Sequence, residues 1–121
     1  MSQRKTDVEA YVLSQDLQGI ASALSPALGC VQLQPEPEIH AHIWRSDQAS
    51  VIVQDSADDF VSVYVIGQFP WGSDIEFARL LAYQLQCTVR CDPEAEHPQT
   101  GPSTFLEINA AQEQLIEWSE D

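Results

Sequence analysis

The sequence predicts an α+β fold: a single two-layer domain in which about two short helices pack on a mostly antiparallel or mixed β-sheet. Residues 39–67 contain three runs of strand-forming residues with short polar connections, which is typical of an antiparallel meander. The segments 14–29 and 73–86 carry apolar residues at helical spacing. The length of 121 residues suits one domain, which we assign to 1–121.

The N-terminal part predicts a strand followed by a helix. Residues 8–13 are rich in β-formers, and Ser14 is a candidate N-cap for the helix that follows. An alternative is one longer helix from residue 7, where a capping-box pattern also occurs. In either case we expect Pro26 and Gly29 to end the helix. Its apolar face consists of Leu17, Ile20, Ala21 and Leu24.

Four strands are predicted in the middle of the chain. Residues 30–34 form a short candidate strand that ends at Pro35 and Pro37, because proline cannot continue a central strand. The last of the other three has apolar side chains on both faces, so we expect it in the centre of the sheet. These three strands are predicted at 39–45, 48–54 and 60–67.

The second helix has the clearest signal in the chain. A capping box from Ser73 to Glu76 begins it, and its apolar face consists of Ile75, Ala78, Leu81, Ala82 and Leu85. Residues 88–91 predict the next strand. Residues 92–103, with three Pro and one Gly, predict an exposed loop. A closing hairpin is expected from 104–108 and 114–118.

Charge and composition exclude several classes of protein. Five Lys and Arg oppose 19 Asp and Glu, which gives a net charge of −14 and argues against binding of nucleic acid through its phosphates. No apolar run is long enough to span a membrane, and no signal-peptide core follows residues 1–7. We therefore expect a cytoplasmic protein without membrane contact. Cys30, Cys87 and Cys91 are expected to be free and mostly buried thiols.

Signatures of enzymes are missing from the sequence. It contains no nucleophile elbow, no phosphate-binding loop and no dinucleotide fingerprint, so we expect no catalytic residue and no cofactor. His40 and His42 are expected on one face of a strand and could supply two metal ligands, with Asp92, His97 or a cysteine as the third. Nothing else supports a metal site, and we interpret both histidines as packing or contact residues.

Acidic residues concentrate in two parts of the chain. Asp55, Asp58 and Asp59 lie in one predicted hairpin connection, and Glu113 and Glu117 belong to the last thirty residues, which contain no Lys or Arg. A solvated surface that keeps the protein soluble explains any single one of them. However, such a large excess of negative charge also creates an electrostatic field that attracts basic partners.

Two tryptophans stand near this charge. Trp71 and Trp118 could each be buried in the core, or they could be partly exposed among the acids, as in an interface for a basic protein. The second interpretation predicts a basic protein partner. The residues predicted to bind it are Asp55, Asp58, Asp59, Trp71, Glu113, Glu117 and Trp118.

The segment Val63–Ala82 and its continuation Thr88–Pro93 combine a strand, a Pro-Trp loop, a helix capped by Ser-Asp and an exit strand that ends in Cys-Asp-Pro. This combination resembles small bacterial immunity proteins of polymorphic toxin systems. It covers about the middle third of the chain, and no functional residue transfers, because immunity families differ in fold and in binding surface. The resemblance implies a cytoplasmic inhibitor that binds and blocks a toxin domain such as a nuclease.

Two other functions are compatible with the sequence. A type III-like secretion chaperone or adaptor is also a small acidic α+β protein, and it would favour a dimer with a hydrophobic groove. A small metal-dependent enzyme using His40 and His42 is the least favoured of the three hypotheses. The inhibitor hypothesis explains the one-sided charge most directly.

Overall fold

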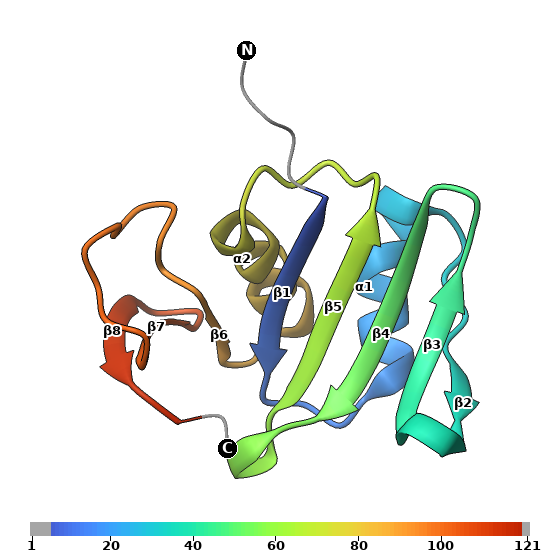
Figure 1. Cartoon of the computed structure of the whole chain (residues 1–121), viewed down its shortest axis with the longest axis horizontal. Helices are drawn as coiled ribbons and strands as arrows, with labels where there is room; N and C mark the ends of the chain where they lie inside the picture. Colours follow the sequence, from blue (N-terminus) through green and yellow to red (C-terminus); the bar gives the residue numbers. More distant parts are fainter. Residues whose placement is uncertain (1–5, 120–121) are drawn as a thin grey trace.

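The computed structural model describes residues 6–119. These residues form one eight-stranded sheet in the order β2-β3-β4-β5-β1-β6-β7-β8, with antiparallel pairing between neighbours. Helices α1 (Leu17–Leu28) and α2 (Asp74–Leu85) lie on the same face of the sheet, behind the strands in Figure 1. The predicted two-layer α+β fold is confirmed.

The strands follow the predicted order closely. Two short 3-10 turns, η1 (Pro37–Ile39) and η2 (Ala57–Asp59), precede β3 and β5. β5 lies between β4 and β1, so its predicted central position is confirmed. The strands are β1 (Asp7–Val12), β2 (Gln34–Glu36), β3 (Ala41–Arg45), β4 (Ala49–Asp55), β5 (Val61–Gly67), β6 (Val89–Cys91), β7 (Thr104–Ile108) and β8 (Glu113–Glu117).

The main core lies between the sheet and the two helices. Every second residue of β5 faces it, and Val63 lies opposite Val53 of β4 and Ala10 of β1. The predicted apolar face of α2 is buried from Ile75 to Ala82, whereas Leu85 is half-buried. The largest fully buried side chains are Phe77, Ile20, Leu24, Ile75 and Leu81.

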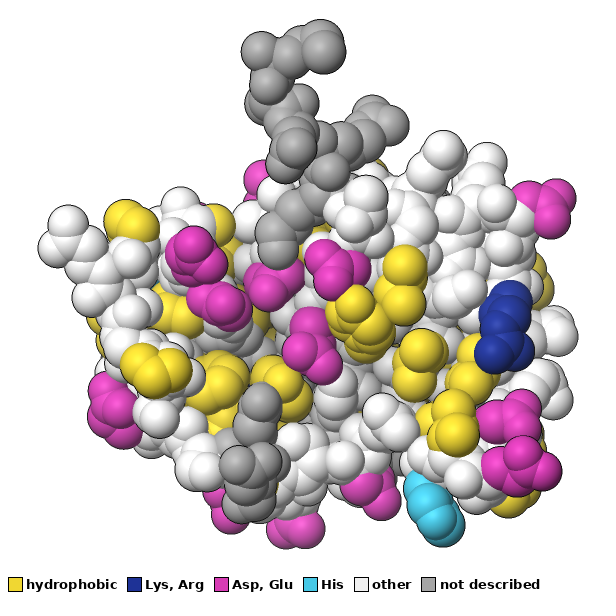
Figure 2. Space-filling view, in the orientation of Figure 1, with side chains coloured by type: hydrophobic (Ala, Val, Ile, Leu, Met, Phe, Trp, Pro, Cys, Tyr) yellow, Lys and Arg dark blue, Asp and Glu magenta, His cyan; other side chains and the backbone are white. Residues whose placement is uncertain are grey.

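On the opposite face of the sheet, the described part of the chain places no helix. Tyr64 and Ile66 of β5 point to this side, and the Ile66 side chain is 40% exposed. Figure 2 shows apolar side chains beside carboxylates on this face. Tyr64 donates a hydrogen bond to Asp7 (2.7 Å), which with partial burial raises the pKa of Tyr64 to about 12. This hydrogen bond joins β5 to β1 on the face away from the two helices.

The beginning and the end of α1 differ from the prediction. The N-cap is Asp16, whose side chain accepts a hydrogen bond from the Gly19 N–H (3.0 Å), whereas Ser14 Oγ accepts from the Asp16 N–H. Pro26 does not end the helix but lies inside its last turn, and Gly29 ends it with φ of 88°. The strand β1 precedes this helix. The prediction of a strand followed by a helix is therefore confirmed, and the alternative of one longer helix from residue 7 is wrong.

The predicted strand at residues 30–34 is wrong in position. The strand β2 begins at Gln34 and includes Pro35, which lies opposite His42 of β3. Proline is tolerated because β2 is an outer strand of the sheet and pairs on one side only. The sequence rule applied to a central strand, and this strand is not central.

All three cysteines are free thiols, as predicted, but their burial differs. Cys30 is exposed and Cys87 is half-buried, whereas Cys91 is buried in the core. Burial is the main cause that raises the pKa of Cys91 to about 12, so its thiol is inert at neutral pH. Within residues 6–119, no helix is long and apolar enough to cross a membrane.

Candidate protein-binding surface

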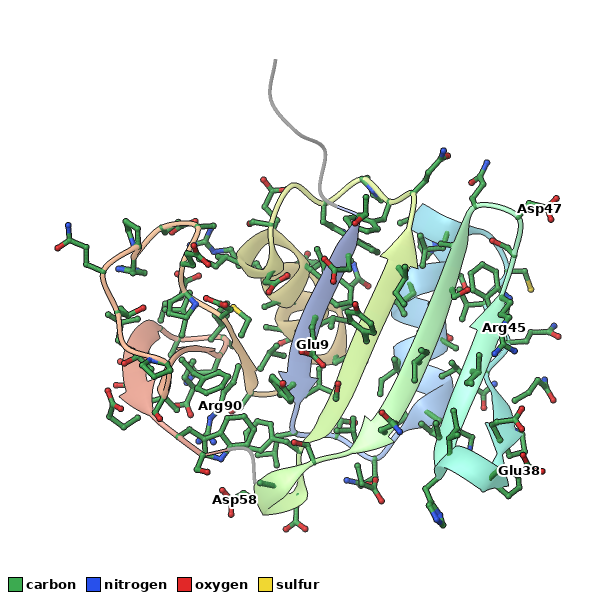
Figure 3. The ribbon with its side chains drawn as sticks, viewed as in Figure 1. Glu9, Glu38, Arg45, Asp47, Asp58 and Arg90 are labelled. Atoms are coloured by element: carbon green, nitrogen blue, oxygen red, sulfur yellow. The ribbon has the colours of Figure 1, made fainter. Side chains whose placement is uncertain are left out.

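The connection from β4 to β5 presents three carboxylates at one end of the sheet. Asp55 is the last residue of β4, and Asp58 and Asp59 lie in the turn η2. All three residues are exposed. Figure 3 shows Asp58 at the end of the sheet where β5 begins. We call this connection, residues 55–59, the acidic loop.

Hydrogen bonds hold the backbone of the acidic loop. The Ser56 N–H donates to the carbonyl of Phe60 (2.8 Å), and the Phe60 N–H donates to the carbonyl of Ala57 (3.0 Å). From the segment before α1, Gln15 Nε2 donates to the carbonyl of Asp59 (3.0 Å). The loop therefore presents its carboxylates from a fixed backbone.

Two successive residues of the loop adopt a strained conformation. Asp58 and Asp59 have φ of 56° and 67°, in the left-handed region that favours glycine. Such residues cost of order 1–3 kcal/mol each, and they persist where the surroundings hold them. Aspartate tolerates this region better than most residues. Because strain of this kind concentrates at functional sites, it supports the acidic loop as a candidate binding element.

An aromatic cluster supports the loop from the open face of the sheet. The Trp118 Nε1–H donates a hydrogen bond of 2.7 Å to Asp58 Oδ2. The Trp118 ring is 8% exposed, and its centroid lies 5.1 Å from that of Phe60, 5.3 Å from Tyr11 and 5.1 Å from Phe105. The structure thus joins two acidic segments that are 60 residues apart in sequence.

Arg90 is integrated into this cluster. Its guanidinium lies 4.4 Å from the ring centroid of Phe60 and 4.8 Å from that of Trp118, within the range of cation–π attraction. It also forms an ion pair of 2.8 Å with Glu107 on the neighbouring strand β7. The charge of Arg90 is therefore matched by a carboxylate other than those of the acidic loop.

A second arginine links the C-terminal segments to α2. Arg79 of α2 forms ion pairs with Glu96 and Glu113, each at 2.8 Å. These hydrogen bonds lower the pKa of both glutamates and raise that of Arg79. Glu113, which the sequence assigned to the partner surface, thus links β8 to α2, and Glu96 links the 92–103 loop to the same arginine.

We expect the Arg79 cluster to stabilise the fold at neutral pH and to lose this effect in acid. A carboxylate with a lowered folded-state pKa contributes stability above its unfolded pKa, roughly 4.3, and loses it as pH falls through the folded value. Urea unfolding of the wild type and of Arg79→Gln should differ most near neutral pH, and the difference should shrink below roughly pH 4. A difference that is constant with pH would contradict this role for Glu96 and Glu113.

The structure separates the other predicted site residues. Trp71 is 9% exposed and packs against Phe69 and Phe77 in the core, beyond the far end of β5 from the acidic loop. Glu117 is exposed, accepts a hydrogen bond from Thr104 Oγ1 (2.8 Å) and precedes Trp118. Asp55, Asp58, Asp59, Glu117 and Trp118 thus gather at one end of the sheet, whereas Trp71 and Glu113 do not.

The two histidines do not share a strand face as expected. His40 precedes β3 and adopts a left-handed conformation with φ of 52° at the end of η1, whereas His42 lies within β3. Both line a hollow of about 270 Å³ together with Asp55. In the part of the chain that the structure describes, no group of three or more His, Cys, Asp or Glu could hold a metal ion.

Sequence reasoning missed the roles of Arg79 and Arg90. Their scarcity is the one signal that could have indicated a role, because only five cationic residues occur among 19 acids. The Asp58–Trp118 contact had no signal, because neither residue lies in a recognisable motif.

The chain was also compared with protein-family models, with curated proteins and with solved structures, and none of these matches it.

Proposed function

We propose that this protein is a non-enzymatic binding protein that acts in the cytoplasm as an immunity-type inhibitor of a basic toxin domain, such as a nuclease. The observation that carries the proposal is the acidic loop: three exposed carboxylates on a strained backbone that Trp118 and Gln15 hold in place.

The distribution of cations supports this proposal. Arg79 and Arg90 both face carboxylates of their own chain. Arg45 has no carboxylate partner among residues 6–119, and it lies on β3, well away from Asp58 in Figure 3. A partner that approaches the acidic loop therefore meets negative charge with little compensation.

Preorganisation gives the loop a further advantage as a binding element. Ordering a flexible loop at an interface costs free energy that is subtracted from affinity. Here the bonds from Trp118 to Asp58 and from Gln15 to Asp59 have already fixed the loop. Its carboxylates can enter a cationic groove that normally holds phosphates, and they block that groove without any chemical step.

Co-expression tests this function. We expect the product of the gene next to the one for this protein to arrest growth when it is expressed alone, and to become harmless when this protein is co-expressed. The triple variant Asp55→Asn/Asp58→Asn/Asp59→Asn, made to the same level, should protect less. An adjacent product that is not toxic, or whose toxicity persists with the wild-type protein, would contradict the proposal.

Association with the toxin domain should depend steeply on salt. The net charge of −14 accelerates encounter with a basic surface, and ions screen it over about 8 Å at physiological ionic strength. Stopped-flow association rates should therefore fall strongly from low to high salt, whereas dissociation rates change less. A flat association rate would mean that the charge serves only solubility.

A further inference from the structure

The strand β8 has one free side. It lies at the end of the sheet, and among the described residues 6–119 it pairs with β7 alone (Figure 1). The Asn109 N–H donates to the carbonyl of Gln112, and the Trp118 N–H donates to that of Ser103. Because bonded pairs alternate along an antiparallel ladder, even-numbered residues of β8 bond to β7. The N–H and C=O groups of Glu113, Leu115 and Glu117 consequently point away from the sheet.

The two edges of the sheet differ in their protection. β2 has three residues, contains Pro35 and continues into η1, all of which hinder the pairing of a further strand. β8 has five residues in continuous register with β7 and contains no proline or lysine. The β8 edge is therefore the side of the sheet that can accept another strand.

Side chains next to this edge define what it can accept. Glu113, Leu115 and Glu117 project to one face, since side chains alternate along a strand. The Leu115 side chain is 44% exposed. It borders a shallow hollow of about 370 Å³ that His97, Pro98, Gln99 and Thr100 also line. An apolar position between two acidic ones thus lies along the open backbone groups.

We propose that the β8 edge binds an extended segment of the basic partner as an added antiparallel strand, with two cationic residues flanking an apolar one at alternate positions. The cationic side chains lie beside Glu113 and Glu117, and the apolar side chain enters the hollow beside Leu115. This inference rests on the proposed function, because it names the segment by which the same partner is held. Glu117 provides more of the charge selection, since Glu113 already binds Arg79.

Charge argues against a second copy of this chain as the occupant. Antiparallel pairing of two β8 edges centred on Leu115 would place Glu113 of one copy beside Glu117 of the other. Like charges at opposed positions destabilise a sheet, and each copy carries a net charge of −14. The same residues that repel a second copy attract a cationic strand.

Synthetic peptides test this edge directly on the wild-type protein. The probe is a seven-residue peptide of threonines with lysine at its second and sixth positions and valine at its fourth. In an NMR titration it should shift the amide signals of Glu113, Leu115 and Glu117. A peptide with glutamates in place of the lysines should bind at least about tenfold more weakly, because it meets like charge.

N-methylation of the peptide separates strand pairing from simple charge attraction. Methyl groups on the amides of lysine and valine remove the donors that face β8 and should weaken binding at least about tenfold. Methyl groups on the two threonines between them face away and should leave affinity unchanged. The variant Leu115→Pro should lose peptide affinity to a similar extent, because proline removes an N–H that does not bond to β7. If this variant does not fold, the methylated peptides alone test strand pairing.

The outcomes distinguish this inference from the function on which it rests. Equal binding of the two methylated peptides, or shifts confined to the acidic loop, would overturn strand pairing at β8 and leave the co-expression result unaffected. Failure of co-expression together with methyl-sensitive binding would refute the inhibitor function but support β8 as a strand acceptor for basic segments.

Discussion

The variant Asp55→Asn/Asp58→Asn/Asp59→Asn is expected to bind the proposed toxin-domain partner at least about 2 kcal/mol more weakly than the wild type, which corresponds to roughly a thirtyfold rise in Kd. Close charge pairs across an interface contribute on this scale, and the exposed loop would lose all three of its charges. Titration calorimetry at fixed ionic strength measures the change.

Asparagine suits this experiment because it keeps the loop in shape. It accepts the left-handed backbone of positions 58 and 59 at least as well as aspartate does. Its side-chain oxygen can still accept the hydrogen bond from Trp118. The free energy of unfolding should therefore change little, and a loss of affinity can be assigned to charge.

A matched control removes the same amount of charge elsewhere. Glu36→Gln/Glu38→Gln/Asp47→Asn neutralises three carboxylates on β2, on η1 and in the connection from β3 to β4, and Figure 3 shows Glu38 and Asp47 on the side of the molecule away from Asp58. This control should retain most of the affinity. Equal losses in both triple variants would show that net charge alone matters. Wild-type affinity in the loop variant would show that the contact is aromatic or apolar.

Replacing Trp118 by alanine is expected to lower the free energy of unfolding by about 3–5 kcal/mol, the usual range for deletion of a large buried aromatic side chain. The ring contacts Phe60, Tyr11 and Phe105, and it lies under the Arg90 guanidinium. Urea unfolding followed by circular dichroism measures the loss. An alanine variant as stable as the wild type would refute a supporting role for this cluster.

The milder variant Trp118→Phe separates packing from hydrogen bonding. Phenylalanine fills most of the site but has no N–H for Asp58, so we expect a loss of about 1–2 kcal/mol. The acidic loop then lacks the hydrogen bond from Trp118. We therefore expect this variant to bind the proposed toxin domain more weakly than the wild type even under conditions in which both proteins are fully folded. Unchanged affinity would show that preorganisation by Trp118 contributes nothing to binding.

Local patterns in the sequence were enough to predict most elements of the fold. Alternation in β5 and the N-cap at Ser73 depend on neighbours a few residues away, and both are confirmed, although the Glu76 carboxylate accepts from the Gly72 N–H and not from that of Ser73. Errors occurred where the outcome depended on the position of a strand in the sheet or on an unexpected turn. Pro35 fits a strand only because β2 is an edge, and His40 leaves the strand because η1 ends there in a left-handed residue.

The candidate site was predictable only in part. Clustering of acids identified the loop, but local patterns could not show that Trp118 supports Asp58 or that Arg79 binds Glu113. Each of these contacts joins segments that meet only after the sheet has formed. Burial of Trp71 was one of two interpretations that the sequence left open, and its ring packs against Phe69 and Phe77, which lie two and six residues away.

The candidate binding residues lie outside the main core of the protein. The main core lies on the side that the helices cover, where Phe77 and Leu81 are fully buried, and a smaller cluster around Trp118 packs on the other side. The acidic loop and the β8 edge lie on the rim, and Asp55, Asp59 and Glu117 are exposed there. Substitutions at exposed positions with ordinary backbone geometry, such as Asp55 and Glu117, usually change stability by less than about 0.5 kcal/mol, whereas Asp59 has a left-handed backbone that few residues tolerate. On the proposed function, single substitutions at Asp55 or Glu117 would therefore change the charge offered to a partner while the fold is retained.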